Sequence, residues 1–402
     1  MKTIKPNVSV IIPCYNIKNE LLLNLASFSG QIYPKTKFEL VIVNDGSTDG
    51  TSQAITKQFT DLSMKMVDLK ERKDRTIARN RGLDVAEGDI IIFCDGDTIC
   101  YPNFISSHVE QYQNTANTVV SGMSKWPSIF TFVRNDFDPV TQKLLNAFLN
   151  QHQKLKSKLP LHIEKTIPLF KKEDVLSGKI FKYVFYPKWA DKISKIVHEY
   201  GLNLLDYPVP WLFFITRNCS VSKEALKETR FDETFSRWGM DDWQLGYRLY
   251  QNGAQFKCTE PTNIHQEHPR QWKERKNELL LNYKKFCRQF PVLPVYLIGL
   301  THFGWNYYRY SKVIADYNIV KSEGRAEMAS FLKYFEIMAV EQYNILARYG
   351  NRGEYALDWE HRKYLWGEIT YNQLKNCSEE MYETGRFSYL NNAFSEFACL
   401  KR

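Results

Sequence analysis

Short apolar runs alternate with helix-like segments through the first hundred residues, and this alternation constrains the fold more than any other feature. The runs are rich in β-branched residues and apolar on both faces, which is typical of parallel strands buried in a sheet. They comprise Val8–Ile12, Glu39–Val43, Met64–Val67 and Asp89–Phe93. Between them lie the predicted helices Glu20–Phe28, Thr51–Phe59 (with Ser47 as its expected cap) and Arg75–Ala86. The pattern predicts an α/β fold with a doubly wound, Rossmann-like sheet and right-handed crossovers.

Two aspartates follow the fourth apolar run, in the sequence Cys-Asp-Gly-Asp that contains Asp95 and Asp97. Ligands of open α/β sheets bind outside the carboxyl ends of the strands, and two carboxylates there suit a divalent cation that bridges to a substrate phosphate. The same spacing occurs at Asp136 and Asp138, but these lead into Pro139 with no strand before them, which is typical of a solvated turn. We therefore predict a metal-held diphosphate at the first pair only.

Polar groups also follow the first two runs. Tyr15 offers a ring for stacking, and Asp45 could accept a hydrogen bond from a base or a ribose, while the turn at Gly46 exposes backbone N–H groups. Asp49 is better explained as part of a turn and helix cap. The chain has no Gly-x-Gly-x-x-Gly after its first run and no Gly-x-x-x-x-Gly-Lys-Ser/Thr motif. These absences argue against a dinucleotide-dependent dehydrogenase and a P-loop NTPase.

Four segments in register resemble the GT-A glycosyltransferases of family 2, namely Val8–Asn16, Val43–Asp49, Ala78–Gly82 and Phe93–Asp97. The resemblance covers roughly residues 7–112 and, after a gap, 208–270. It implies a GT-A fold with a mixed sheet and a UDP-sugar donor, whose uracil Tyr15 and Asp45 would hold.

The same resemblance implies a set of site residues in this first half. The nucleotide-sugar-binding residues would be Pro13, Tyr15, Asn16, Asp45, Arg79 and Asp95. Arg79 would face the nucleotide, Asp95 would contact the ribose or the metal shell, and Asp97 would ligate Mn²⁺ or Mg²⁺. Asn44 stands where many members of the family have a second aspartate, which leaves Asp45 as the sole carboxylate at this strand end.

A second group of candidates surrounds Trp238-Gly-Met-Asp-Asp-Trp243, where a turn exposes a helix that starts with Asp241 and Asp242. Both carboxylates complement the helix dipole. Because like charges oppose each other's ionisation, we expect one of the two to have a raised pKa. The segment resembles the acceptor-side motif of inverting galactosyltransferase-like and chondroitin polymerase-like enzymes. This resemblance implies that Asp242 is the catalytic base and that Asp241 and Trp238 bind the acceptor; retaining relatives carry an asparagine at the position of Asp242.

Further candidates come from three short segments. His265 and His268 lie three residues apart, a spacing that alone indicates a surface pair without a ligand role. The resemblance nevertheless implies that His265 completes the metal shell, and an imidazole ligand favours manganese over magnesium. The segment that contains Asn218 resembles a turn before a substrate-contacting helix, so Asn218 is a candidate acceptor contact. Trp211 is a candidate sugar platform.

The net charge of +9 is concentrated in one segment. Residues 151–195 contain eleven lysines and four acidic residues. This basic excess could bind an anionic acceptor, a polyanionic glycan or a membrane surface, or it could be an ordinary solvated face. No nucleic-acid-binding motif accompanies it, so we expect no nucleic-acid partner.

Other features bear on the compartment. No apolar leader follows Met1, and the apolar stretch Val292–Leu300 is interrupted by Pro294 and too short to span a bilayer. The eight cysteines show no Cys-x-x-Cys spacing, and Cys14 and Cys94 fall at expected buried strand ends. We expect a reduced, cytoplasmic protein, with peripheral contact at the inner face of the membrane as the alternative.

Four parts are expected along the chain. Residues 1–122 form the nucleotide-sugar-binding half, 123–207 a Lys-rich, partly helical insertion, 208–290 the acceptor half, and 291–402 an aromatic-rich helical region. In the last part, Ser322 is the expected cap of a helix whose apolar face runs from Met328 to Leu346 before Gly350. The cluster Phe303–Tyr310 is expected to pack inside this region, with an acceptor surface or a homodimer surface as the alternatives.

The predicted function is an inverting, metal-dependent transfer of a sugar from a UDP-sugar to a hydroxyl of a glycan, glycolipid, peptide or small molecule. One alternative is a sugar-phosphate nucleotidyltransferase, which would require a Gly-rich, Arg-bearing loop after the first strand, where this chain has Pro-Cys-Tyr-Asn. Another alternative is a catalytically inactive glycan-binding module.

Overall fold

The computed structural model describes residues 7–112, 117–160, 162–187, 191–269, 272–302, 304–349 and 368–397. The chain forms two compact units. The sheet unit comprises Met1–Leu204 and Pro210–Arg275, and the helical unit comprises Leu205–Val209 and Lys276–Arg402. The division before Lys276 falls upstream of the boundary expected at residue 291.

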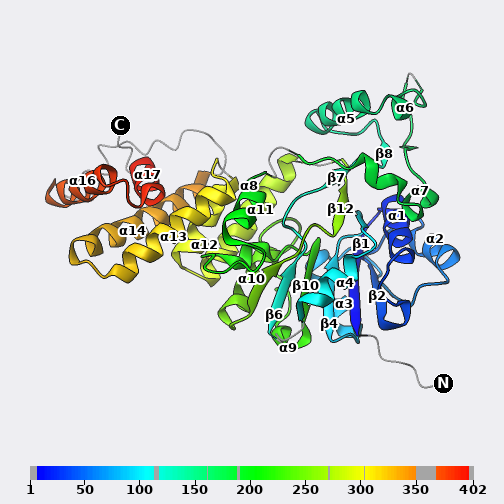
Figure 1. Ribbon diagram of the computed structural model, residues 1–402, viewed down its shortest axis with the longest axis horizontal. Coiled ribbons are helices and arrows are strands. Elements are labelled where there is room, and N and C mark those ends of the chain that lie inside the picture. The colour runs from blue at the N-terminus through cyan, green and yellow to red at the C-terminus, as the bar shows by residue number, and fades with distance from the viewer. Residues whose placement is uncertain are drawn as a thin grey trace. The chain divides into compact units, whose positions relative to one another are not determined.

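A seven-stranded mixed sheet forms the centre of the sheet unit, with the strand order β11-β6-β10-β4-β1-β2-β3 (Figure 1). Its strands are β1 (Val8–Cys14), β2 (Phe38–Asn44), β3 (Met64–Asp68), β4 (Ile90–Cys94), β6 (Thr118–Ser121), β10 (Asn218–Ser222) and β11 (Gln255–Cys258). Strands β1 to β4 are parallel, and β10 runs antiparallel to both β4 and β6. The predicted α/β class and the four predicted strands are confirmed.

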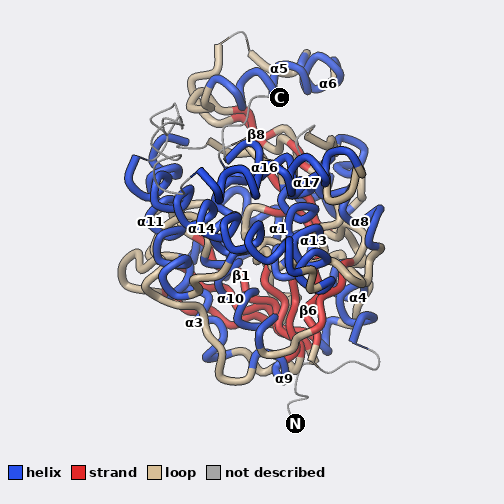
Figure 2. Tube along the Cα trace, turned by 90° about the vertical axis from the view of Figure 1, so that its left-hand side faces the viewer, coloured by secondary structure: helices blue, strands red, loops and turns tan. Residues whose placement is uncertain are grey.

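The predicted helices are confirmed as α1 (Lys18–Ser29), α2 (Thr51–Gln58) and α3 (Arg75–Val85), and helices lie on both faces of the sheet (Figure 2). The chain moves from β1 to β2 and β3 on one side and then crosses to β4 on the other. Strands β1 and β4 therefore flank the point where the strand order reverses, and a crevice outside their carboxyl ends is the usual ligand site of such sheets.

Three local predictions need correction. Strand β3 is only half-buried rather than fully buried, because it lies at the sheet edge and pairs with β2 alone. Helix α2 begins after Gly50 in the left-handed conformation (φ 81°) and is not capped by Ser47; Asp49 accepts the Thr51 N–H instead, at 3.1 Å. Asp138 is not in a simple turn, since it caps helix α5 (Pro139–Gln151).

A three-stranded sheet lies beside the end of β4, in the order β5-β12-β7. Its strands are β5 (Thr98–Cys100), β12 (Asn263–Gln266) and β7 (Ser128–Ile129). Strand β12 pairs antiparallel with β5, so that His265 lies opposite Thr98. This register brings a strand from late in the chain next to the aspartates that follow β4.

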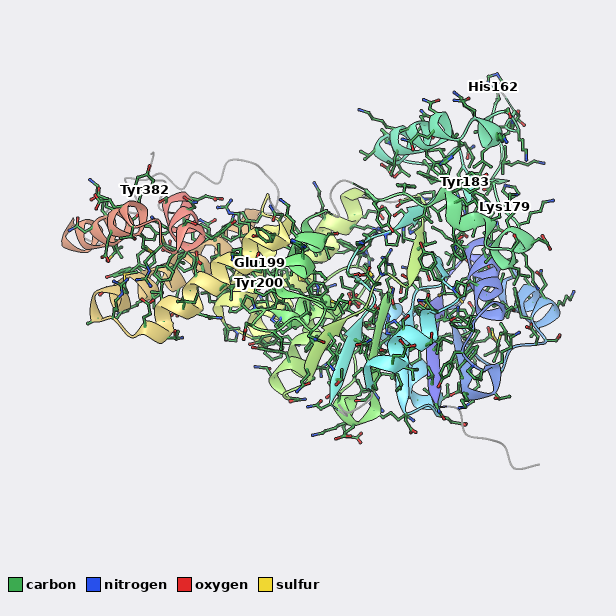
Figure 3. All side chains as sticks on the ribbon, in the orientation of Figure 1. His162, Lys179, Tyr183, Glu199, Tyr200 and Tyr382 are labelled. Carbon is green, nitrogen blue, oxygen red and sulfur yellow. The ribbon has the colours of Figure 1, made fainter. Side chains whose placement is uncertain are left out.

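The Lys-rich insertion contains short helices and a two-stranded sheet, β8 (Phe132–Val133) with β9 (Ile167–Pro168). Its helices are α5, α6 (Gln153–Lys156), α7 (Lys172–Leu176), the 3₁₀ helix η3 (Lys179–Tyr183) and α8 (Asp191–Tyr200). Rings of Phe130 and Phe148, 5.4 Å apart, lie in its core. Lys154, Lys156 and Lys158 are exposed. Figure 3 marks part of this segment by His162, Lys179 and Tyr183.

The helical unit contains α12 (Leu293–Ile298), α13 (Tyr307–Glu323), α14 (Ala326–Tyr349), α16 (Glu368–Glu383), α17 (Ser388–Phe397) and most of α11 (Trp272–Gln289). Ser322 is not a cap, because it lies in the last turn of α13, which ends at Gly324 (φ 62°). Trp305 is buried and stacks on Phe397 at 5.8 Å, so this side chain packs inside the unit as expected. Phe303 and Gly350 lie outside the described residues.

Two further observations concern the whole described part of the chain. Among its helices, none has both the length and the apolar character needed to cross a membrane. None of the seven described cysteines forms a disulfide, and Cys14 and Cys94 are buried as expected.

Candidate active site

Asp97, His265 and His268 form a compact cluster just beyond β4. One potential ligand atom from each lies within 4.8 Å of the others. The Asp97 Oδ2 atom is 3.2 Å from His268 Nε2 and 4.0 Å from His265 Nε2. The structure therefore brings together the two residues predicted as metal ligands. His268 was not predicted as a ligand, although its three-residue spacing from His265 was visible in the sequence.

The surroundings of this cluster fit a divalent metal ion. The buried Asp97 Oδ1 atom has no hydrogen-bond partner. Burial favours protonation of Asp97, but the His268 hydrogen bond and the nearby His265 outweigh it and hold the pKa of this carboxyl well below its usual range. The Glu267 Oε1 atom lies 3.4 Å from His265 Nδ1, which turns the other ring nitrogen toward Asp97. Two imidazoles with one carboxylate suit Mn²⁺ better than Mg²⁺.

Arg217 is a buried cation beside this cluster that the sequence reasoning missed. Its guanidinium lies 3.9 Å from the Trp126 ring centroid, and its Nε and Nη1 atoms have no hydrogen-bond partner. Burial lowers the pKa of Arg217 to about 10, against the opposing fields of Asp95 and Asp97. The residue therefore adds a fixed positive charge to a group of carboxylates.

Arg79 joins the end of β4 to a second pair of aspartates. This residue of α3 is almost fully buried. Its Nη2 atom is 3.1 Å from Asp95 Oδ1, and its Nη1 atom is 3.1 Å from Asp241 Oδ2 and 3.7 Å from Asp242 Oδ1. Three carboxylates thus share one guanidinium, which compensates the cost of burying it.

Asp241 and Asp242 begin helix α10 (Asp241–Gln251), after a turn in which Gly239 (φ 102°) and Met240 (φ 67°) have left-handed backbone conformations. The Asp241 carboxylate is buried, and its two oxygens pair with Arg79 and with Arg75 Nη2, at 2.5 Å from the latter. The prediction that Asp241 binds an acceptor hydroxyl needs correction, because both oxygens already bind internal arginines.

Asp242 differs from its neighbour because its side chain is 22% exposed. Its two oxygens accept hydrogen bonds from one residue, Thr216, through the backbone N–H at 3.2 Å and Oγ1 at 2.7 Å. Burial and the adjacent Asp241 raise the pKa of Asp242 to about 6. The expectation that one carboxylate of this pair has a raised pKa is confirmed. Sequence reasoning singled out the segment that begins at Thr216, but it chose Asn218 from that segment and gave Thr216 no role.

The residues predicted to hold the nucleotide base lie at the ends of β1 and β2. Tyr15 is exposed, and the guanidinium of Arg72 lies 4.6 Å from its ring centroid. Asp45 accepts the backbone N–H groups of Lys73 at 2.6 Å and Asp74 at 3.0 Å, so the segment after β3 packs against it. Sequence reasoning did not include this segment in the site.

Three further residues at these strand ends have clear local environments. Asn44 donates to Asp68 Oδ1 at 2.7 Å, which favours an amide at this position because a carboxylate there would face Asp68. Asn16 accepts the backbone N–H of Thr48 at 2.8 Å and so ties the β1 turn to the β2 turn. Pro13 is the last residue but one of strand β1.

Two residues predicted to contact the acceptor are structural. Asn218 is fully buried, where its Nδ2 donates to the Gly122 carbonyl at 3.0 Å and its Oδ1 is 2.9 Å from His108 Nε2. Trp211 is also buried, with its ring edge-on to Tyr247 at 5.4 Å. Neither side chain is accessible to an acceptor, so both predictions need correction.

Trp238 remains a candidate for binding the acceptor. It is half-buried at the turn before α10, and the Arg275 guanidinium lies 5.7 Å from its ring centroid. A partly exposed indole four residues before the partly exposed Asp242 suits contact with a sugar ring.

Comparison with known proteins shows similarity to glycosyltransferases. The chain is 32% identical over 265 residues, 65% of either protein, to the uncharacterized glycosyltransferase YfnE of Bacillus subtilis (strain 168). It is 27% identical over 304 residues to validoxylamine A glucosyltransferase of Streptomyces hygroscopicus subsp. limoneus, over 74% of this chain and 60% of that one. It is 28% identical over 267 residues to chondroitin synthase of Escherichia coli, over 65% of this chain and 35% of that one.

These matches cover less than two thirds of the length of each of the three relatives. The family model described as Glycosyl transferase family 2 matches residues 9–176, a range that contains β1 to β4 and the aspartates Asp95 and Asp97. This match and the 32% identity to a named glycosyltransferase agree with the strand-end motifs and their positions around the reversal of strand order. Residues 9–176 of the chain are therefore similar to glycosyl transferase family 2, and the chain resembles named glycosyltransferases.

Proposed function

We propose that the protein is an inverting, metal-dependent glycosyltransferase that moves a sugar from a UDP-sugar to a hydroxyl group of an acceptor. The observation that supports this proposal best is the environment of Asp242. A partly exposed carboxylate with a raised pKa lies at the start of α10, and Arg79 joins it to Asp95 at the end of β4. A candidate base is thereby held next to the strand end that suits a nucleotide diphosphate.

The donor side rests on residues at the ends of β1, β2 and β4. Tyr15 would stack on the base, and Asp45, already oriented by two backbone N–H groups, would accept from it. Asp97, His265 and His268 would hold a divalent cation, preferably Mn²⁺, which neutralises negative charge on a departing diphosphate. The buried Arg217 adds positive charge on the same side.

The acceptor side rests on Asp242. A carboxylate with a pKa of about 6 is ionised at neutral pH, yet it is basic enough to take a proton as the hydroxyl attacks. The proton moves from the acceptor hydroxyl to the Asp242 carboxylate, the hydroxyl oxygen bonds to the anomeric carbon, and the bond from that carbon to the diphosphate breaks. Attack from the face opposite the leaving group inverts the anomeric configuration.

The substitution Asp242→Asn tests this proposal, because it keeps the shape of the side chain and removes its ability to take a proton. We expect the transfer rate to fall by roughly a hundredfold or more, while UDP affinity stays the same. Transfer is measured as UDP release from a panel of UDP-sugars with acceptors, and affinity by calorimetry with UDP and Mn²⁺. The matched control is Asp84→Asn, at an exposed aspartate of α3 that pairs with Arg81.

A fully active Asp242→Asn enzyme, or one that has lost UDP binding, would remove Asp242 from the proposed mechanism. The anomeric configuration of the product, read by NMR, tests inversion separately. A product that retains the donor configuration would exclude direct displacement whatever the variants show.

A further inference from the structure

In the turn between the 3₁₀ helix η5 (Pro210–Phe213) and β10, Thr216 contacts the start of α10. This residue is buried, and it gives two hydrogen bonds to Asp242: its N–H to Oδ2 and its hydroxyl to Oδ1. Two donors on one residue, one for each oxygen, fix the plane of the carboxylate as well as its position. The Asp242 side chain is 22% exposed, so it is held in place without being closed off from solvent.

The packing of η5 against α10 holds this arrangement in place. A Cβ atom added at Gly246 of α10 would lie 2.6 Å from the Cβ atom of Phe214 and 2.8 Å from the carbonyl oxygen of Trp211. The helix therefore approaches the turn more closely than any larger residue would allow. Trp243 reinforces the contact, because its Nε1 donates to the Leu212 carbonyl at 3.1 Å. Trp211 thus serves the site as part of this packing, although it does not touch an acceptor.

We propose that Thr216 is a positioning residue for Asp242, which orients the carboxylate toward the acceptor hydroxyl and stabilises its ionised form. This inference rests on the proposed function, since it assigns Thr216 a role only if Asp242 is the base.

The charges around Asp242 show what the hydroxyl of Thr216 adds. Asp241 on the same helix opposes ionisation of Asp242, as does burial, whereas Arg79 and Arg75 of α3 favour it. Arg79 also pairs with Asp95 and Asp241, so its charge is shared. The Thr216 hydroxyl, by contrast, donates to Asp242 Oδ1 at 2.7 Å. A hydrogen bond to the charged form lowers a pKa, so loss of the hydroxyl should raise the pKa of Asp242.

The substitution Thr216→Val tests the proposal, because valine has nearly the same shape and keeps the backbone N–H but lacks the hydroxyl. We expect kcat to fall by about tenfold and the acidic limb of the kcat–pH profile to move up by about one pH unit, with the donor KM unchanged. Thr216→Ser restores the hydroxyl and should restore both the rate and the limb.

The matched control is Thr141→Val, which removes a threonine hydroxyl that donates to the carboxylate of Asp138 at 2.5 Å, far along the chain in the insertion. We expect this variant to keep the wild-type pH profile. Thermal melts of all three variants check that each is folded.

Several results would overturn the proposal. One is a Thr216→Val enzyme with the wild-type rate and limb. Another is a Thr216→Val enzyme whose rate falls without any movement of the limb. A Thr216→Ser enzyme whose acidic limb is displaced would also overturn the proposal. This measurement tests the proposal even if the valine variant does not fold. Each of these leaves the proposed function intact if Asp242→Asn is inactive; an active Asp242→Asn enzyme refutes the proposed function itself.

Discussion

Replacing Asp97 by asparagine tests the candidate metal site, and the second Asp-x-Asp of the chain provides the comparison. Asp97→Asn removes the charge of the carboxylate whose buried Oδ1 has no protein partner. Asp138→Ala removes a helix cap that accepts the N–H groups of Val140 and Thr141, both at 3.1 Å. Asp97→Asn should therefore change the response to Mn²⁺, whereas Asp138→Ala should change the stability of the metal-free protein.

The expected magnitudes follow from binding linkage and from capping. At a Mn²⁺ concentration of about 100 times its Kd, binding stabilises the folded protein by about 2.7 kcal/mol. With about 2–4 °C per kcal/mol for a large domain, the Tm of the wild-type protein should rise by roughly 5–10 °C. Asp97→Asn should abolish this rise. Asp138→Ala should lower the Tm in metal-free buffer by the equivalent of about 1 kcal/mol and keep the full rise.

Thermal melts of the wild type and both variants, each with EDTA and with Mn²⁺, measure these quantities without any substrate. Isothermal titration of Mn²⁺ gives the Kd needed to set the concentration. If Asp97→Asn kept the Mn²⁺ response, or if Asp138→Ala lost it, the assignment of Asp97 rather than Asp138 as a metal ligand would be wrong.

Two further predictions concern the helix start and the insertion. Gly246→Ala adds a Cβ atom that would lie 2.6 Å from Phe214 and push α10 away from the turn. We expect it to destabilise the protein by about 1–3 kcal/mol in urea melts and to reduce the transfer rate more than the affinity for UDP. An unchanged transfer rate would contradict this. Replacing the exposed Lys154, Lys156 and Lys158 by glutamine should raise the KM for an anionic acceptor at low salt, with less effect as salt is added, and should leave donor hydrolysis intact. If the variant and the wild type had the same KM for the acceptor at low salt, these lysines would form an ordinary solvated face.

Local patterns were enough to predict the strands and most of the helices around the site. The apolar runs that became β1, β2 and β4 are continuous in sequence, and the polar residues after them necessarily lie at one edge of a parallel sheet. The half-exposure of β3 could not be predicted, because strand order is set by packing between distant segments. Asp97 and His265 were paired through a family resemblance, since their separation along the chain gives no local signal.

The errors at the site have a common physical origin. Trp211 and Asn218 have side chains that suit sugar contacts, but burial decides whether such a side chain is available, and burial is a property of the folded chain. Asp241 was assigned to an acceptor because Arg75, 166 residues away in sequence, was not known to reach it. Thr216 was missed for the same reason, since a threonine 26 residues before an aspartate carries no recognisable pattern.

The sharing of Arg79 among three carboxylates affects how any mutational scan of this site must be interpreted. Removal of Asp95 frees the guanidinium to bind Asp241 and Asp242 more strongly, and removal of Asp242 has the converse effect. Substitutions at residues that share a partner are not additive, with interaction energies of about 0.5–3 kcal/mol. A scan of single variants would therefore count the same interaction more than once. Double-mutant cycles between Asp95 and Asp242 would separate the contribution of each carboxylate to the transfer rate from the interaction that they share through Arg79.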